Sequence, residues 1–182
     1  MRAISDSQLD TLSLAVEVFC SHGDEVVPYL PWHASKNPYH WLVAEVLLRL
    51  TTRTAARRAY RQLTRTYPDW QALREAQTEQ VAATIAPAGL QNQKAKQLKQ
   101  LAQVLSFEGS FPCAEVELLE LPGIGQYAAD ALRLHLCHQV TLPLDSNVQR
   151  VFRRVVGLPV PSNSRRSDPY TDTWLVEIAQ RV

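Results

Sequence analysis

Two carboxylates stand in unusual surroundings in this chain of 182 residues. Asp145 follows an apolar Leu-Pro-Leu and precedes a segment with apolar residues at helical spacing, so we expect its side chain to be poorly solvated. Such a carboxylate is either the N-cap of the following helix, the commonest role for Asp there, or a group poised for chemistry. Glu45 is the one acidic residue in a strongly apolar run, 41–50, which is expected to be a buried helix.

A glycine turn precedes Asp145 in the sequence. Pro122-Gly123-Ile124-Gly125 is expected to connect two short helices, 116–121 and 126–137. Glycine can adopt positive φ and lets another backbone approach closely. The second helix then begins with unpaired N–H groups at the positive end of its dipole, which can hold a phosphate without reading base sequence. Taken alone, the same turn is equally explained as a compact connection.

A row of arginines follows the Glu45 helix. The spacing of four places Arg53, Arg57, Arg61 and Arg65 on one face of a helix that Thr51 or Thr52 can cap. We interpret this row as a solvated face opposite an apolar stripe, with a nucleic-acid-binding face as the alternative.

The elements that position these residues are expected to be helices throughout. Apolar residues recur every three or four positions through most of the chain, and the alternation typical of strands is nearly absent. An amphipathic helix is expected over 91–107, with Lys94, Lys96 and Lys99 largely outward, and a core helix after Asp145. The fold class is therefore all-α.

Composition narrows the class of protein. With 46% hydrophobic and 20% charged residues the chain can bury a sizeable core, and a net charge of +1 excludes a uniformly basic coat for nucleic acid. Cys20, Cys113 and Cys137 are too few and too scattered for a disulfide scaffold, and they form no zinc motif. With no signal peptide and no long apolar run in the sequence, we expect a soluble, cytoplasmic protein.

These motifs, taken together, resemble a known family. LPGIGQYAADAL followed by LDSNVQRV is similar to the helix-hairpin-helix-Gly-Pro-Asp (HhH-GPD) superfamily of DNA glycosylases. LPWHASKNPYHWLVAEVLLRLTT and GLQNQKAKQLKQLA resemble the branch that contains endonuclease III, the adenine mismatch glycosylases and the thymine/uracil mismatch glycosylases. The resemblance implies a two-lobed helical fold, in which 1–37 and 138–182 form a terminal lobe and 38–137 a bundle ending in the hairpin, 114–137.

The resemblance also implies roles for the two carboxylates. Asp145 matches the aspartate that stabilises the positive charge developing on the sugar when the N-glycosidic bond breaks. Glu45 matches the glutamate that protonates the leaving base in the adenine-removing branch. Burial among Val43, Val46 and Leu47 should raise its pKa, as that role requires. The competing interpretation of Glu45 is a structural carboxylate tied to an arginine or to a helix N-terminus.

Tyr127 occupies the position where strand-nicking members carry a lysine that forms a Schiff base. A phenol cannot do so, so the resemblance implies a monofunctional enzyme that leaves an abasic site. The target base must leave the helical stack, and Leu50 with Thr51 and Thr52 matches the residues that fill the vacated space. The other positions that the resemblance assigns to DNA binding are Gly123, Ile124, Gly125, Gln126 and Arg150. Backbone carbonyls of Leu119, Leu121 and Ile124 match a monovalent cation site.

The sequence departs from the family at its C-terminal end. Many relatives carry four cysteines for an iron–sulfur cluster there, whereas this chain lacks them, so no cluster is expected. The chain is expected to be either a compact variant or a shortened product. The compact variant predicts a monomer or a weak dimer covering an apolar face of Leu12, Val16 and Leu175.

Two functions follow as hypotheses. The first is a base-excision-repair glycosylase that removes thymine or uracil opposite G, or adenine opposite G or oxidised G, from double-stranded DNA with a mismatched or damaged base. The missing domain for oxidised guanine and the LLRLTT segment favour the thymine/uracil type. The alternative is a non-catalytic helix-hairpin-helix module that binds DNA after losing its activity. Release of a base from a mismatched duplex separates the two.

Overall fold

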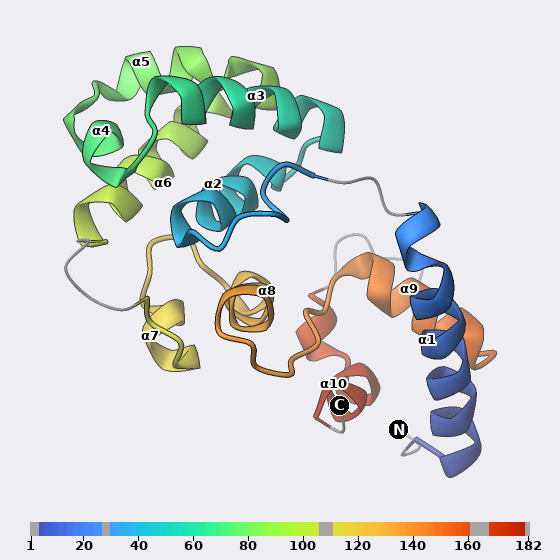
Figure 1. The fold of residues 1–182 in the computed structure, drawn as a ribbon. Coiled ribbons are helices and arrows are strands. Elements are labelled where there is room, and N and C mark those ends of the chain that lie inside the picture. The colour runs from blue at the N-terminus through green and yellow to red at the C-terminus, as the bar shows by residue number, and fades with distance from the viewer. Residues whose placement is uncertain (1–3, 27–29, 106–110, 161–167, 181–182) are drawn as a thin grey trace. The chain divides into compact units, whose positions relative to one another are not determined.

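The structure is a computed structural model that describes residues 4–26, 30–105, 111–160 and 168–180. Within these residues the chain forms α-helices and short 3-10 helices with no strand, which confirms the all-α prediction (Figure 1). The chain divides into two compact units. The terminal unit comprises Met1–Pro28 and Gln139–Val182, and the central unit is Tyr29–His138. No helix in the described ranges is long and apolar enough to cross a membrane.

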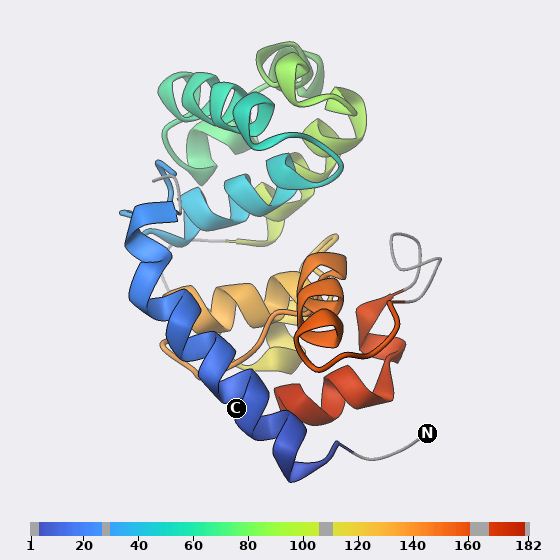
Figure 2. The ribbon, with the colours of Figure 1, turned by 90° about the vertical axis from the view of Figure 1, so that its right-hand side faces the viewer.

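In its described residues, 30–105 and 111–138, the central unit contains seven α-helices and one 3-10 helix. In chain order they are α2 (Pro38–Leu48), α3 (Arg53–Thr66), α4 (Trp70–Glu75), α5 (Thr78–Thr84), η1 (Ala86–Ala88), α6 (Gln91–Val104), α7 (Glu115–Leu119) and α8 (Gln126–Leu136). The helix α2 lies in the middle of this unit, with α3 on one side and α8 on the other (Figures 1 and 2).

The sequence explains why α2 is central. Leu42, Val43 and Leu47 are completely buried, because the run is apolar around the whole helix and can pack on several neighbours at once. The helix begins where the side chain of Asn37 accepts a hydrogen bond from the N–H of Tyr39 at 2.9 Å. Asn37 thus fixes the start of the helix that carries Glu45.

Lys94 corrects the expectation that the lysines of α6 point outward. Its side chain is buried, and its ammonium donates hydrogen bonds to the carbonyl of Leu47 at 3.0 Å and to that of Ala88 at 2.9 Å. Both carbonyls lie at the end of a helix, where the backbone lacks intrahelical donors. Lys94 therefore ties α2 and η1 to α6, a role that amphipathic periodicity does not reveal.

The cysteines also differ from expectation. Cys113, before α7, and Cys137, after α8, form a disulfide, whereas Cys20 is exposed and free. The two bonded cysteines are 24 residues apart in the sequence, and their Cα atoms lie 5.7 Å apart. The chain folds back between them through the glycine turn, so the covalent bond closes the base of the hairpin.

The terminal unit is built from helices at both ends of the chain: α1 (Asp6–Val26), α9 (Ser146–Val155), η2 (Pro169–Thr171) and α10 (Thr173–Ala179). Its buried apolar residues are Ile4, Leu12, Leu144, Trp174, Leu175 and Ile178. Leu12 and Leu175 thus lie in the core, which corrects the expectation that they form an exposed face with Val16. The exposed apolar residues of α1 are Leu14, Val16, Val18 and Phe19.

A polar network holds α9 in this unit. The valines and Phe152 of α9 are only half-buried, and the buried residue of this helix is Gln149, which corrects the expected apolar core helix. Gln149 donates to Asp172 at 2.9 Å, and Arg153 forms an ion pair with the same carboxylate at 2.7 Å. The helix that begins at Asp145 is therefore oriented by charge-assisted hydrogen bonds as well as by packing.

Candidate functional site

The hairpin consists of α7, a glycine turn and α8. Gly123 has a φ of +72°, a left-handed conformation that favours glycine, and the N–H of Ile124 donates to the carbonyl of Leu121 at 3.1 Å. Gly125 is the N-cap of α8, and no side chain caps the helix. The positive end of the α8 dipole therefore begins at a glycine, which leaves room for an anion to approach its N–H groups.

Gln97 of α6 braces this turn, a contact that sequence reasoning missed. Its amide donates to the carbonyl of Pro122 at 3.3 Å and to that of Gly123 at 3.1 Å. A Cβ added to Gly123 would lie 2.3 Å from the amide nitrogen of Gln97, so a side chain there would displace this amide from the turn in addition to straining the backbone at positive φ. No sequence pattern signals this pairing, since Gln97 looks like any polar residue of an amphipathic helix.

Gln97 also connects the hairpin to the turn after α2. The guanidinium of Arg49 donates to the side-chain oxygen of Gln97 at 3.5 Å, at the limit of a hydrogen bond. Next to it, Leu50 has a φ of +53° and is 84% exposed. A left-handed backbone conformation is strained for leucine, and exposure of its apolar side chain to water is also unfavourable. The exposure of Leu50 therefore indicates contact with a ligand rather than packing in the core.

Thr51 and Thr52 end this turn. Thr52 is the N-cap of α3, and its hydroxyl accepts a hydrogen bond from the N–H of Ala55 at 3.3 Å, as the sequence predicted. The N–H of Thr51 donates to the carbonyl of Leu48 at 3.4 Å. The turn between α2 and α3 is therefore closed at both ends, and it presents Leu50 between them.

Glu45 lies on α2 with its side chain only partly exposed, and burial raises its pKa from the ordinary 4.5 to about 7. Within the described residues its carboxyl group has no hydrogen bond or ion pair. The competing interpretation of Glu45 as a structural carboxylate, bound to an arginine or a helix N-terminus, therefore has no support among the described residues. A carboxyl group of this kind can keep or release a proton near neutral pH.

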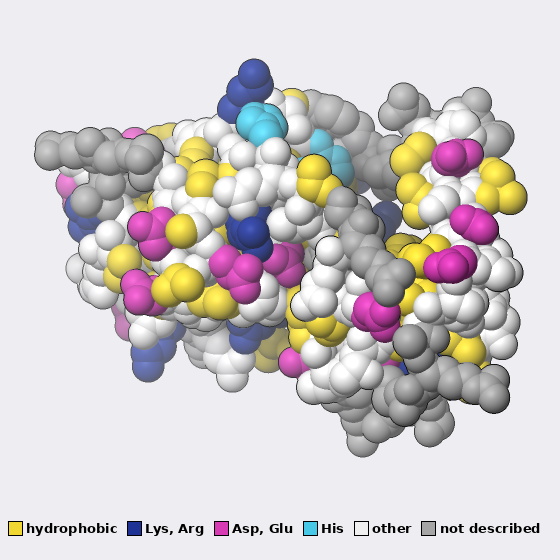
Figure 3. Space-filling view, turned by 90° about the horizontal axis from the view of Figure 1, so that it is seen from below, with side chains coloured by type: hydrophobic (Ala, Val, Ile, Leu, Met, Phe, Trp, Pro, Cys, Tyr) yellow, Lys and Arg dark blue, Asp and Glu magenta, His cyan; other side chains and the backbone are white. Residues whose placement is uncertain are grey.

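Tyr127 lies in the first turn of α8, and 42% of its side chain is exposed. The neighbouring Gln126 donates to Glu115 of α7 at 2.9 Å, and Arg133 forms ion pairs with Glu115 at 2.7 Å and with Asp130 at 3.3 Å. Acidic and basic side chains also neighbour one another in the view from below (Figure 3). These contacts hold the two helices of the hairpin together and so fix the backbone position of Tyr127.

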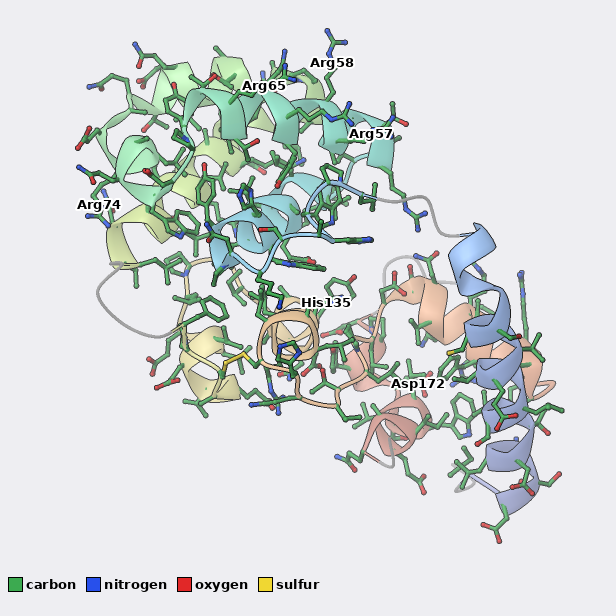
Figure 4. All side chains as sticks on the ribbon, in the orientation of Figure 1. Arg57, Arg58, Arg65, Arg74, His135 and Asp172 are labelled. Atoms are coloured by element: carbon green, nitrogen blue, oxygen red, sulfur yellow. A yellow bond between two sulfur atoms is a disulfide. The ribbon has the colours of Figure 1, made fainter. Side chains whose placement is uncertain are left out.

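His135 connects α8 to α2 through its ring. It stacks on Trp41 with centroids 4.1 Å apart, and His33 stacks on Trp41 with centroids 5.7 Å apart. Figure 4 shows His135 on α8 beneath α2. Burial lowers the pKa of both histidines, so neutral rings are favoured in the stack. No pattern in the sequence signals this contact.

Asp145 is the N-cap of α9. Its carboxylate accepts hydrogen bonds from the N–H groups of Asn147 at 2.9 Å and Val148 at 2.7 Å, and from the Asn147 side chain at 2.7 Å. Arg150 donates in turn to Asn147 at 2.9 Å. The capping interpretation is therefore confirmed. Because the side chain is half-buried rather than enclosed, capping leaves part of the carboxylate accessible for chemistry.

The structure brings most of the expected site residues into one unit. Glu45, Leu50, the hairpin turn and Tyr127 all belong to the central unit, where α2 packs against α8. Asp145 and Arg150 belong to the terminal unit. Their placement against the extruded base therefore remains a prediction. Among the described residues no three His, Cys, Asp or Glu side chains are placed to hold a metal ion.

Comparisons with known proteins place the chain in a family. Residues 43–167 match the model of the "HhH-GPD superfamily base excision DNA repair protein". A thymine-DNA glycosylase of Aeropyrum pernix is 35% identical over 169 residues, which are 92% of this chain and 73% of that protein. A thymine/uracil-DNA glycosylase of Pyrobaculum aerophilum is 37% identical over 155 residues, 84% of this chain and 66% of that protein.

Solved structures agree with the sequence relatives. The structure of a thermostable thymine-DNA glycosylase matches with a TM-score of 0.82 and 27% identity, over 97% of this chain and 80% of that one. A non-covalent endonuclease III–DNA complex shares the fold, with a TM-score of 0.73 at 19% identity over 95% of this chain and 75% of that one. The match over residues 43–167 and these relatives show that the chain belongs to the HhH-GPD superfamily of base excision DNA repair proteins.

Proposed function

We propose that this base-excision DNA glycosylase removes thymine or uracil mispaired with guanine in duplex DNA and leaves an abasic site. The general activity follows from family membership and from identities of 35% and 37% to thymine- and thymine/uracil-DNA glycosylases. The observation that carries the choice of base is the likeness to thymine-DNA glycosylase over almost the whole chain, at a TM-score of 0.82. A non-catalytic DNA-binding module has no support from these comparisons.

DNA binding begins at the hairpin. The N–H groups at the start of α8, with Gly123, Ile124, Gly125 and Gln126, would hold a phosphate of the backbone. Such contacts position the protein without reading sequence, which suits an enzyme that must recognise a mispair anywhere. A monovalent cation held by the carbonyls of Leu119, Leu121 and Ile124 would add positive potential there, and carbonyl oxygens suit a hard cation.

Access to the base requires that the nucleotide leave the stack. Leu50 is the strongest candidate to fill the vacated space, because an exposed apolar side chain on a closed turn can insert between bases. Thr51 and Thr52 would contact the strand beside it, and Arg150 would contact a phosphate from α9. Gln97 holds the Leu50 turn and the hairpin in a fixed relation through Arg49 and the carbonyl of Gly123.

Asp145 and Glu45 would divide the chemistry. As the glycosidic bond breaks, positive charge develops on the sugar and negative charge on the leaving base. The Asp145 carboxylate, oriented by α9, would stabilise the first charge and position the attacking water. Glu45, whose pKa is about 7, would donate a proton or a hydrogen bond to the leaving base.

The reaction would stop at the abasic site. Cutting the strand by β-elimination needs an amine that forms a Schiff base with the sugar, and Tyr127 supplies a phenol at that position. Tyr127 would instead line the pocket with its exposed ring. The protein would act as a monomer or a weak dimer.

A panel of labelled duplexes tests the proposal. Duplexes carrying T:G, U:G, A:G and A opposite oxidised G are incubated with the protein and then treated with alkali, which cuts abasic sites. Cleavage of the T:G and U:G duplexes is expected. Preferential cleavage of the adenine duplexes would contradict the choice of base, and strand breaks before alkali would contradict the role of Tyr127.

A further inference from the structure

The outward face of α3 is strongly basic. This helix contains five arginines and no acidic residue, and its buried side is formed by Ala56, Ala59, Tyr60 and Leu63. On the opposite side a shallow groove is lined by Thr54, Arg57, Arg58, Arg61, Gln62 and Arg65. We call Arg57, Arg58, Arg61 and Arg65 the arginine face. Figure 4 shows Arg57, Arg58 and Arg65 on the side of α3 that faces away from α2.

The charges of the arginine face are not neutralised by the protein. Within the described residues none of these four arginines has an ion pair or a hydrogen bond. Arg57, Arg61 and Arg65 follow one another at intervals of four residues, a spacing at which like charges repel and destabilise the helix. An anionic ligand along the groove would remove this repulsion.

The basic surface continues onto a second helix. A neighbouring groove between α3 and α5 is lined by Gln62, Arg65, Thr66, Ala83 and Thr84. No acidic residue lines either groove, although the chain as a whole carries a net charge of only +1. Three arginines at intervals of four extend over about 12 Å of helix axis, a length in which each DNA strand presents several phosphates.

The arginine face is remote from the hairpin within the central unit. The helix α2 packs against both α3 and α8 and lies between them (Figures 1 and 2). The labelled Arg57, Arg58 and Arg65 lie on the side of α3 opposite α2 (Figure 4). Because α2 separates the arginine face from the hairpin, we expect a ligand of this face to be separate from the segment under repair.

We propose that the arginine face binds the phosphate backbone of a second duplex DNA segment while the hairpin holds the first. The proposal rests on the proposed function only in taking DNA as the substrate. Guanidinium groups bind phosphate oxygens through two parallel hydrogen bonds, and threonine and glutamine side chains add further donors. The contact would carry no base specificity and would weaken with salt.

The composition of the groove favours DNA over an acidic protein. Protein interfaces have an apolar or aromatic centre that supplies most of the binding free energy. The groove along α3 is lined only by arginine, threonine and glutamine, a composition typical of the polar and positively charged surfaces that contact DNA.

Energy transfer between two undamaged duplexes, one with a donor and one with an acceptor fluorophore, tests this proposal. We expect the wild-type protein to bring the two duplexes together. The variant R57Q/R61Q/R65Q should reduce the apparent affinity for the second duplex at least tenfold. It should also lower the slope of log affinity against log salt by about 2 to 3, because about 0.9 counterions are released per phosphate contact.

A matched variant, K36Q/K96Q/R154Q, removes the same charge from exposed positions elsewhere. This variant should leave the energy transfer close to the wild-type level. An equal loss of energy transfer in both variants would contradict DNA binding specific to the arginine face. Unchanged energy transfer in R57Q/R61Q/R65Q would also overturn the proposal. So would a competition experiment in which polyglutamate displaces the duplex from the wild type at a lower concentration than DNA does.

Base release from a short T:G duplex under saturating protein is measured in parallel. R57Q/R61Q/R65Q should release the base at the wild-type rate, since its arginines take no part in the reaction. If the wild type releases no base, the proposed function fails, while the transfer measurement still decides whether the arginine face binds DNA.

Discussion

The two units hold their carboxylates in opposite ways. In the central unit Glu45 lies on a helix packed on several sides, without a described hydrogen-bond partner, and its pKa rises to about 7. In the terminal unit Asp145 caps a helix and accepts three hydrogen bonds while staying half-buried. Burial without a partner favours the protonated form of Glu45, whereas hydrogen bonds from the start of α9 orient the side chain of Asp145.

The cores of the two units differ as well. The central unit has a continuous apolar core that runs from Leu30 to Leu132. Among its described residues the terminal unit has six buried apolar side chains in its core cluster and a buried polar network around Asp172. In that network Gln149 Oε1, Asp172 Oδ1 and Trp174 Nε1 have no described hydrogen-bond partner. We therefore expect the terminal unit to be the less stable of the two.

Replacement of Asp145 should give the largest effect. Asn is as good an N-cap as Asp, so Asp145→Asn should keep the helix while removing the charge. Base release from a T:G duplex should slow by on the order of 10²–10³-fold, with duplex affinity unchanged. The comparison variant Asp145→Ala should in addition lose about 1 kcal/mol of stability through the lost cap. Wild-type rates in Asp145→Asn would place the reactive anion elsewhere.

Reduction of the disulfide should destabilise the central unit. A bond between residues 24 positions apart restricts the unfolded chain and contributes about 3 kcal/mol. Cys113→Ser should therefore lower the free energy of unfolding by about that amount and should abolish the effect of a reductant on the thermal midpoint. Cys20→Ser, at the exposed free cysteine, is the matched control and should change neither quantity. Equal midpoints with and without reductant in the wild type would contradict the bond.

Glu45 should make stability fall as the pH rises. Folding raises its pKa from 4.5 to about 7, so the native state binds the proton more tightly than the unfolded chain. The contribution is fully present below pH 4.5 and is lost between pH 4.5 and 7. Glu45→Gln should therefore gain about 2 kcal/mol relative to wild type between pH 4 and pH 8, a value reduced for the partial exposure of the side chain. Denaturant unfolding at both pH values measures this gain, and parallel pH profiles would refute it.

Gly123→Ala should give the smallest change in stability but a clear change in binding. The new Cβ would clash with Gln97 at 2.3 Å, and a φ of +72° costs an alanine about 1–2 kcal/mol. We expect the turn to shift and duplex affinity to fall about tenfold. Gly125→Ala is the control, because its Cβ would meet no atom within 4 Å and its φ of −101° suits any residue. Equal effects of the two variants would show that Gln97 does not brace the turn.

The sequence predicted those features that depend on local pattern. Helical periodicity, the Thr52 cap, the glycine turn and the direction of the Glu45 pKa all follow from residues close together in the chain. Lys94, Gln97 and the pair Cys113–Cys137 were missed or misplaced because each has a partner 24 to 47 residues away in the sequence, such as Leu47 for Lys94. Gln149 was missed because its burial depends on the position of Asp172, which periodicity cannot supply.

Free thymine is the most direct measure of the central claim. A T:G duplex is incubated with excess protein for a single turnover, and the released base is separated by chromatography while the strands are examined without alkali. We predict one free thymine per duplex with both strands intact. A folded protein that binds the T:G duplex and releases no thymine would contradict this prediction.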